Sequence, residues 1–246
     1  MRYLVLTDIH ANLEALDACL ADARSRSCDQ TLVLGDLVGY GADPNAVVAR
    51  VQALNPIAIV RGNHDKVACG LEQAEGFNAV AKSAARWTLD VLEPAYRDWV
   101  AALPQGPTQV DDVVEICHGS PFDEDAYIFD ELDAVRALKV STRPLCLFGH
   151  THYPVTFELS SESFDSVGST YPDNHVQMRD GCKYLLNPGS VGQPRDGDPR
   201  AAYAIVDTDQ KRVELYRLKY PVEEAQAKII DAGLPEVLAQ RLAVGR

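Results

Sequence analysis

The sequence lacks three features that would each have assigned the chain to a class of protein. It has no run approaching the roughly 18 apolar residues that a membrane-spanning helix needs. A strand-like run begins at Tyr3, so the N-terminus has neither the length nor the cleavage site of a signal peptide. None of its six cysteines forms a C-x-x-C pair, which argues against zinc ribbons and thioredoxin-like sites. We therefore expect a cytoplasmic protein without membrane partners, whose cysteines are reduced.

The chain is also poor in basic residues. It has 23 lysines and arginines against 36 acidic residues, a net charge of -13. Because this charge repels a phosphate backbone, we expect no stable nucleic-acid binding. A local cationic site can still attract a phosphate, and bound metal ions would create one. The 246 residues, 46% of them apolar, are typical of a globular protein, and we expect one domain over residues 1–246.

The order of predicted elements favours an α/β fold. The first 65 residues alternate strand, helix, strand, helix, strand, with Asn12 and Asp43-Pro44 at the two helix starts. This alternation predicts a parallel sheet with crossover helices. The acidic residues 123–133 are typical of a solvated loop and helix face, and the polar residues 160–181 indicate a protruding loop or hairpin. Further strands are predicted at 113–117, 145–148, 201–206 and 213–218, and further helices at 78–103, broken at Pro94, and 222–242, broken at Gly233.

Metal-binding residue types follow these strands. Five of the six histidines come directly after a predicted strand, together with two aspartates and an asparagine. The carboxyl ends of strands in an α/β sheet converge on one edge, where ligand sites form. Alone, a Gly-Asp pair is often a turn, and Asp8 could cap a helix. In combination, five motifs are expected along one rim: Asp8-Ile9-His10, Gly35-Asp36, Gly62-Asn63-His64-Asp65, His118-Gly119 and Gly149-His150-Thr151-His152.

The ligand types indicate which ions such a site would hold. Imidazole and carboxylate without thiolate suit Mn, Fe, Zn or Ni. Seven such ligands are too many for one ion, whereas two ions sharing a bridging carboxylate fit the number. Paired metals roughly 3.5–4 Å apart stabilise both the attacking and the leaving oxygen in phosphatases and nucleases.

The five motifs, in this order and spacing, resemble the full motif set of the calcineurin-like metallophosphoesterases. Residues 187–195 are also similar to the small bacterial and archaeal branch typified by the YfcE phosphodiesterases. The resemblance implies an α/β fold built as a four-layer α/β/β/α sandwich, with helices outside two β-sheets and the metals at one sheet edge.

The resemblance also implies roles for the site residues. Asp8, His10 and His152 would hold the first metal, Asp36 would bridge, and Asn63, His118 and His150 would hold the second. His64 would lie beside the leaving group, as a general acid or as a donor to a phosphoryl oxygen. A neighbouring carboxylate would raise its pKa into the useful range, and Asp65 is the nearest in sequence.

The function implied is metal-dependent hydrolysis of phosphodiester or phosphomonoester bonds in a small phosphorylated substrate. A hydroxide bridging two divalent transition metals would attack phosphorus in line, with manganese favoured and iron, nickel or zinc as alternatives. A phosphodiesterase is favoured, and a homodimer is expected by resemblance. A non-catalytic metal-binding scaffold is a competing hypothesis, but all seven ligand positions and His64 are filled.

Two departures from the family bear on the substrate. The arginine that follows Gly-Asp in phosphoprotein phosphatases is absent after Asp36, which lowers the odds of a phosphoprotein or dinucleoside-polyphosphate phosphatase. Arg195 is a candidate to replace it, with a surface ion pair as the alternative. The insert after Asp65 is predicted to form a small helical cap over residues 70–103. Asn78 and Tyr40 are then candidate substrate contacts, with helix capping and ordinary packing as their alternatives.

Overall fold

Two β-sheets form the centre of the computed structural model, which describes residues 1–160, 164–168 (backbone only) and 175–246. The first sheet has six strands in the spatial order β3 (Ala58–Ile59), β2 (Gln30–Val33), β1 (Arg2–Leu6), β11 (Ala201–Asp207), β12 (Arg212–Leu218) and β9 (His175–Gln177). β1 and β3 run parallel to β2, which confirms the parallel unit predicted for the first 65 residues. β11 and β12 form the predicted antiparallel pair.

The second sheet has the order β4 (Thr108–Gln109), β5 (Val114–Ile116), β6 (Leu145–Leu147), β10 (Lys183–Asn187), β7 (Val155–Leu159) and β8 (Phe164–Gly168). β6 runs parallel to both β5 and β10. β7 and β8 pair antiparallel, so residues 164–168 of the polar segment 160–181 form a strand that pairs with β7, which agrees with the hairpin alternative. Residues 161–163 and 169–174 of that segment lie outside the described residues.

The helices predicted after Asn12 and Asp43-Pro44, and those at 78–103 and 222–242, are confirmed, whereas the short helix at residues 63–68 is not among the predicted elements. The Asn12 side chain accepts a hydrogen bond from the backbone N–H of Ala15 at 3.1 Å and so caps the first helix. None of the helices in the described ranges is long and apolar enough to cross a membrane. Their bounds are α1 Leu13–Ala23, α2 Pro44–Leu54, α3 Asn63–Ala68, α4 Ala79–Val91, α5 Pro94–Ala101, α6 Glu131–Val140, α7 Val222–Asp231 and α8 Glu236–Leu242.

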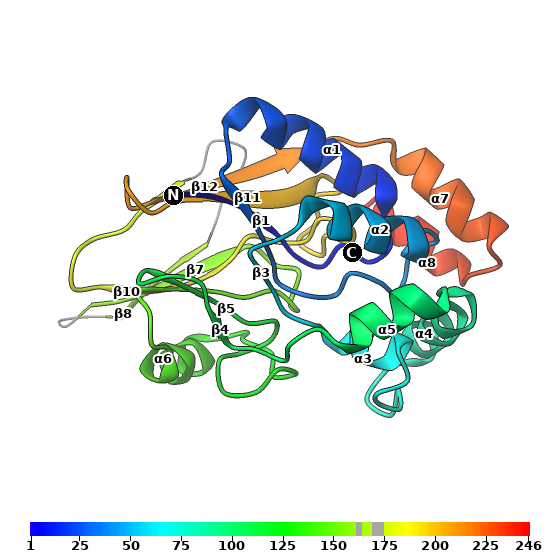
Figure 1. Cartoon of the computed structure of the whole chain (residues 1–246), viewed down its shortest axis with the longest axis horizontal. Coiled ribbons are helices and arrows are strands. Elements are labelled where there is room, and N and C mark those ends of the chain that lie inside the picture. Colours follow the sequence, from blue (N-terminus) through cyan, green and yellow to red (C-terminus); the bar gives the residue numbers. More distant parts are fainter. Residues whose placement is uncertain (161–163, 169–174) are drawn as a thin grey trace.

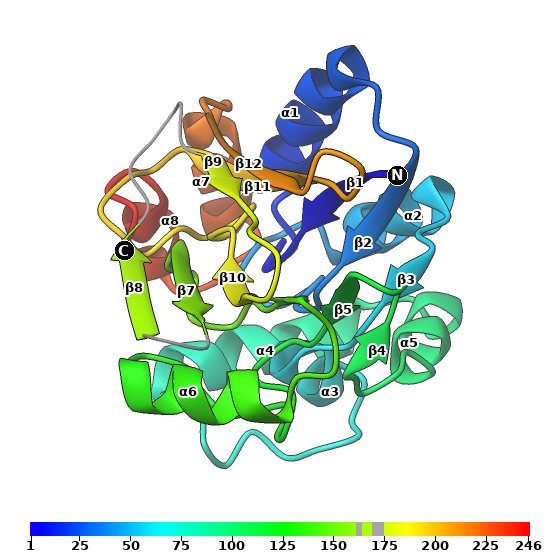
Figure 2. The same cartoon turned by 90° about the vertical axis from the view of Figure 1, so that its left-hand side faces the viewer.

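Three hydrophobic cores separate four layers, because strand side chains alternate between the two faces of a sheet (Figures 1 and 2). In β1, Leu4 and Leu6 pack with α1 and α2, whereas Tyr3 and Val5 face the second sheet. In β6, Cys146 packs against α6 on the far side of the second sheet. The predicted four-layer α/β/β/α sandwich is therefore confirmed.

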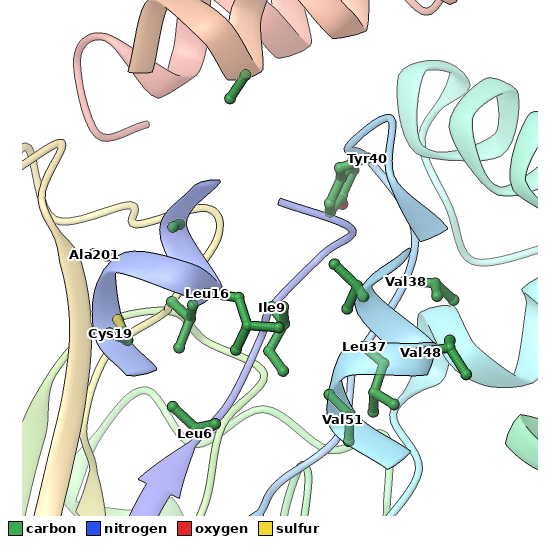
Figure 3. Packing of buried hydrophobic residues seen from close by; sticks show 14 of the residues in the cluster. Leu6, Ile9, Leu16, Cys19, Leu37, Val38, Tyr40, Val48, Val51 and Ala201 are labelled. Carbon is green, nitrogen blue, oxygen red and sulfur yellow. The ribbon is translucent and has the colours of Figure 1, made fainter. Parts of the chain in front are cut away.

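The core outside the first sheet also contains the insert. Ala84 of α4 and Val100 of α5 are buried in the same cluster as Leu16 and Val48, which Figure 3 shows on α1 and α2. The insert thus shares a core with the crossover helices. That it caps the site stays a prediction.

Candidate metal centre

The predicted ligands come together from two sheets. Asp8 and His10 follow β1, Asp36 follows β2, and Asn63 begins α3 directly after β3. The other three follow strands of the second sheet, His118 after β5 and His150 and His152 after β6. The prediction that a single sheet edge carries all of them is wrong in this respect, because β5 and β6 pair with each other and not with β1 to β3. The two sheets face each other, so the edge of each sheet that carries these residues lies next to that of the other.

The backbone at these strand ends is held in an uncommon conformation. Five of the ligand candidates have a left-handed backbone, which costs a residue with a Cβ atom about 1 kcal/mol. They are Asp8 (φ 51°), His10 (φ 49°), Asp36 (φ 51°), His150 (φ 67°) and His152 (φ 60°). The surrounding fold therefore imposes the directions of these side chains, as is common at functional sites.

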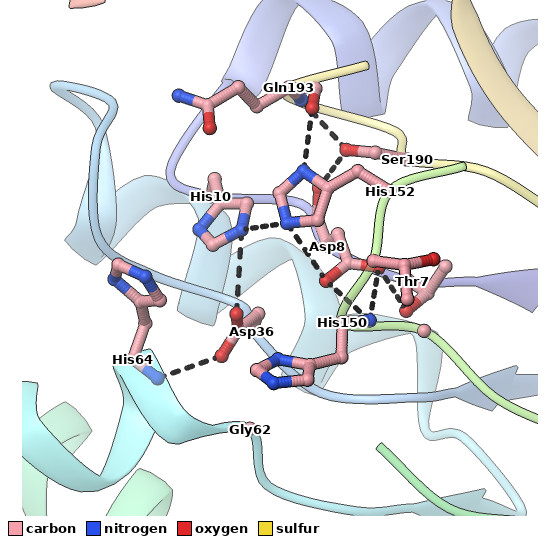
Figure 4. A network of polar contacts seen from close by, with 12 residues as sticks. Thr7, Asp8, His10, Asp36, Gly62, His64, His150, His152, Ser190 and Gln193 are labelled. Atoms are coloured by element: carbon pink, nitrogen blue, oxygen red, sulfur yellow. Dashed lines mark hydrogen bonds and ion pairs between the residues drawn. The ribbon is translucent and has the colours of Figure 1, made fainter. Parts of the chain in front are cut away.

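Buried ligand atoms gather into two groups that share Asp36. Asp8, His10, Asp36 and His152 form the first and Asp36, His118 and His150 the second, with the ligand atoms of each group within 4.8 Å of one another. Asp36 Oδ2 lies 3.4 Å from His10 Nε2 and 3.5 Å from His118 Nε2. Asn63 Oδ1 lies 3.2 Å from His118 Nε2, next to the second group. Figure 4 shows Asp36 between His10 and His150.

Backbone carbonyls orient all four imidazoles of these groups. A carbonyl only accepts, so the ring nitrogen facing it carries the proton when the ring is neutral, and the other nitrogen directs a lone pair at the centre. The pairs are His10 Nδ1 with Val38 O (3.1 Å), His118 Nδ1 with Leu34 O (2.8 Å), His150 Nε2 with Asp125 O (3.1 Å) and His152 Nδ1 with Gln193 O (2.6 Å).

The donor set fits bound cations. His10 Nε2 and His152 Nε2 are 3.1 Å apart. Burial lowers the pKa of both rings well below its usual value, so both are neutral and direct lone pairs at each other. Burial alone would lower the pKa of His118 too, but Asp36 raises it to about 10. The negative charge of Asp36 thus stabilises a positive charge at the position where a metal ion would lie.

His64 lies beside the first group in an aromatic setting. Its ring centre is 4.3 Å from that of Tyr40 and 4.5 Å from that of Phe77. Burial lowers its pKa to about 4, and its Nδ1 has no hydrogen-bond partner among the described residues. Asp65 does not fill the role expected of it, because its carboxylate accepts the backbone N–H groups of Gly62, Leu37 and Val38.

The three candidate substrate contacts differ in their surroundings. Arg195 directs an Nη atom at the hydroxyl of buried Tyr40 (3.4 Å) and at Oε1 of Gln193 (3.2 Å). The surface ion pair considered as its alternative is not seen in the described part of the chain. The Asn78 side chain accepts the N–H of Ala81 at 2.9 Å and so caps α4.

A cleft of about 580 Å³ opens beside the second ligand group. Its lining includes three carboxylates and two aromatic rings. Among the described residues, no lysine or arginine lines it. The Tyr127 ring stacks on His150 with 3.8 Å between ring centres. Tyr127 is not among the residues predicted from the sequence, because it lies in the acidic stretch 123–133, whose composition indicates a solvated face. The lining residues are Asn63, Val67, Glu72, Gln73, Glu75, Gly76, Phe77, Asp125, Tyr127 and His150.

Lys66 of α3 supports the wall of this cleft. Its side chain is only 2% exposed, and its Nζ lies 2.6 Å from Asp125 and 3.2 Å from both Glu72 and Glu124. Burial alone would lower the pKa of Lys66, but the bond to Asp125 raises it, so the lysine is charged. The backbone carbonyl of Asp125 faces His150 Nε2, so Lys66 holds the segment that orients a ligand candidate.

We therefore expect Lys66→Met to weaken both the fold and the metal site. Removing one partner of a buried ion pair costs about 3–5 kcal/mol, and the partial exposure of Glu72 and Asp125 reduces this to about 2 kcal/mol. Loss of an orienting contact lowers metal affinity by about tenfold or more. Urea unfolding and calorimetric Mn²⁺ titration measure the two effects. Exposed Lys82→Met is the control, and equal behaviour of both variants would contradict the role of Lys66.

The site consists of two groups of buried carboxylate and imidazole ligands that share one aspartate. Together with its position at the strand ends of an α/β/β/α sandwich, this arrangement is typical of metal-dependent phosphoesterases. Comparison with known families agrees. Residues 1–211 match the calcineurin-like phosphoesterase superfamily domain, and the chain belongs to this superfamily. The resemblance drawn from the five motifs is confirmed at this level.

Three individual proteins are similar to this chain over nearly its whole length. An uncharacterized protein of Methanocaldococcus jannaschii is 36% identical over 248 residues, which cover 98% of this chain and 97% of that protein. The crystal structure of a metallophosphoesterase from Sphaerobacter thermophilus is 38% identical, with a TM-score of 0.88 over 100% of this chain and 99% of that one. A hypothetical protein from Pyrococcus horikoshii, 20% identical, shares the fold with a TM-score of 0.81 over 100% of this chain and 98% of its own.

Proposed function

We propose that the protein hydrolyses phosphodiesters with two divalent transition metal ions, manganese being the favoured metal. The observation that carries this proposal is the position of Asp36, whose carboxylate belongs to both ligand groups. Bound there, the ions would supply Lewis acidity and lower the pKa of water, so that hydroxide is available near neutral pH. Asp8, His10 and His152 would hold one ion and Asn63, His118 and His150 the other.

The side chains around the ligands would bind and orient the ester. His64 is neutral at pH 7, so a ring N–H can donate to a phosphoryl oxygen, the second of the two roles considered for it. Arg195 and Tyr40 are proposed to contact the substrate from the side of the first ligand group. Phe77 and Tyr127 offer apolar rings to the leaving group.

The charge of the cleft supports a diester over a monoester. A diester carries one negative charge, whereas a monoester carries close to two at neutral pH. Lys66 is shared by Glu72 and Asp125, so these two carboxylates and Glu75 leave the cleft with a net negative charge, which repels the second charge of a monoester. The absence of an arginine after Gly35-Asp36 also removes one partner for a dianionic phosphate.

The test uses protein stripped of metal with EDTA, then supplied separately with Mn²⁺, Fe²⁺, Ni²⁺ or Zn²⁺. We expect two ions bound per chain by elemental analysis, and hydrolysis of bis(p-nitrophenyl) phosphate restored best by Mn²⁺, with a higher kcat/KM than for p-nitrophenyl phosphate. A preference for the monoester would overturn the diester assignment. Two bound ions without turnover of either ester, or of a panel of natural phosphodiesters, would favour a metal-binding scaffold.

A further inference from the structure

A second pocket, of about 440 Å³, lies on the side of the first ligand group and is lined by arginines. Tyr153, which follows the ligand candidate His152, is part of its lining. Arg195 connects the pocket to the centre, because it contacts the hydroxyl of Tyr40, whose ring packs on His64. The lining residues are Tyr153, Arg195, Asp196, Gly197, Arg241 and Arg246.

The pocket gathers more positive charge than the protein neutralises. Within the described ranges, Arg195 forms no ion pair with a carboxylate and contacts neutral side chains only. The Nε of Arg241 donates at 2.6 Å to the main-chain oxygen of Arg246, the last residue, where a terminal carboxylate neutralises it in part, and the side chain of Arg246 adds a third guanidinium group to the pocket. The acidic residue of the pocket, Asp196, is already paired with Arg217.

The guanidinium groups of Arg195 and Arg241 both lie near the Tyr40 ring and line the same pocket. The Cζ atoms of Arg195 and Arg241 are 5.8 Å and 5.9 Å from its centre. Burial, and then repulsion by Arg195, lowers the pKa of Arg241. In a chain with a net charge of -13, a pocket that gathers three guanidinium groups, one of which (Arg195) has no carboxylate partner among the described residues, indicates an anionic ligand.

We propose that Arg195 and Arg241 form a subsite for a second anionic group of the substrate, a carboxylate or phosphate joined to the scissile ester. The planar guanidinium group suits both anions, because its N–H donors match their oxygens in pairs. This subsite rests on the proposed function, and it predicts the orientation in which the diester binds. The anionic end of the diester lies toward Arg195, and the uncharged end lies in the cleft that carries Glu72 and Glu75.

The first test compares three p-nitrophenyl phosphodiesters, whose second alcohol is 3-hydroxypropanoate, ethanol or choline. We expect the wild-type kcat/KM to be about tenfold higher for the carboxylate ester than for the ethyl ester, and lowest for choline, since a charged hydrogen bond has that value. Arg241→Gln and Arg195→Gln should each reduce the ratio of carboxylate to ethyl ester toward one. The control Arg24→Gln removes the same charge from an exposed position and should keep the ratio.

A ratio near one in the wild-type protein, or an unchanged ratio in both variants, would overturn the subsite. A second measurement does not depend on hydrolysis. In EDTA-stripped protein, sulfate should raise the melting temperature more than chloride at equal ionic strength, in part because sulfate stabilises folded proteins in general. This difference should be smaller in both variants than in the wild-type protein and in Arg24→Gln. If no diester is hydrolysed, the proposed function fails and the sulfate measurement still decides whether the arginines bind an anion. Equal sulfate effects in all four proteins would reject the site.

Discussion

Asp36→Asn is expected to lower kcat/KM for bis(p-nitrophenyl) phosphate by about 10³-fold and to reduce the metal content below two ions per chain. Metal ions contribute several kcal/mol of charge stabilisation in the transition state, and each 1.36 kcal/mol is about a factor of ten in rate. The Asn side chain keeps the acceptor for the N–H of His64, which lies 2.9 Å from Oδ1. It replaces Oδ2, which faces His10 and His118, by an amide that cannot bind metal.

The substitution also removes one negative charge, and a control must do the same. Asp17→Asn does so at a half-exposed ion pair with Arg50, whose contribution to stability is small. Stopped assays with excess Mn²⁺, together with elemental analysis of the dialysed protein, separate loss of binding from loss of catalysis. Wild-type activity with two bound ions in Asp36→Asn would refute the shared carboxylate as the basis of the proposed function.

The candidate ligands could be predicted from the sequence because the position of each one after a strand depends on local order. A strand that ends in Asp, Asn or His delivers that residue to the sheet edge whatever the rest of the chain does. Asp8, Asp36 and His118 are examples, each within three residues of the end of a strand. The division between two sheets was not visible in the strand patterns, since a buried strand such as residues 145–147 has the same apolar character in either sheet.

The residues that support the site could not be predicted in this way. Lys66 is one lysine in a six-residue helix that is too short for periodicity, and its partners Glu124 and Asp125 are 58 and 59 residues away. Arg241 lies near the Tyr40 ring although it is in α8, 201 positions further along the chain. Long-range contacts between charged side chains leave no local pattern, so only the folded chain shows that these residues border the site.

The carboxylate of Asp36 has little free space around it, and Gly62→Ala tests whether this close packing positions the carboxylate. A Cβ atom at Gly62 would lie 2.0 Å from Asp36 Oδ1 and 2.5 Å from the Asp36 backbone nitrogen. The backbone of Gly62 is extended (φ -107°, ψ 176°), so alanine meets no conformational penalty and the effect is purely steric. Relief requires displacement of the Asp36 carboxylate and of α3. We expect a loss of about 1–3 kcal/mol in the free energy of unfolding and, because both ligand groups depend on Asp36, about 10²-fold weaker metal binding.

The matched variant is Gly76→Ala, where an added Cβ would meet no atom within 4 Å. At such a position alanine stabilises by about 0.4–1 kcal/mol, because it restricts the unfolded chain. Gly76 borders the cleft, so the comparison is made in unfolding free energy and Mn²⁺ affinity and not in turnover. Urea unfolding in EDTA measures the steric cost apart from metal binding, and the same titration with Mn²⁺ adds the binding free energy. If Gly62→Ala bound Mn²⁺ as tightly as Gly76→Ala, the close approach of α3 would not be what positions the shared carboxylate, and the left-handed backbone of Asp36 itself would have to hold it.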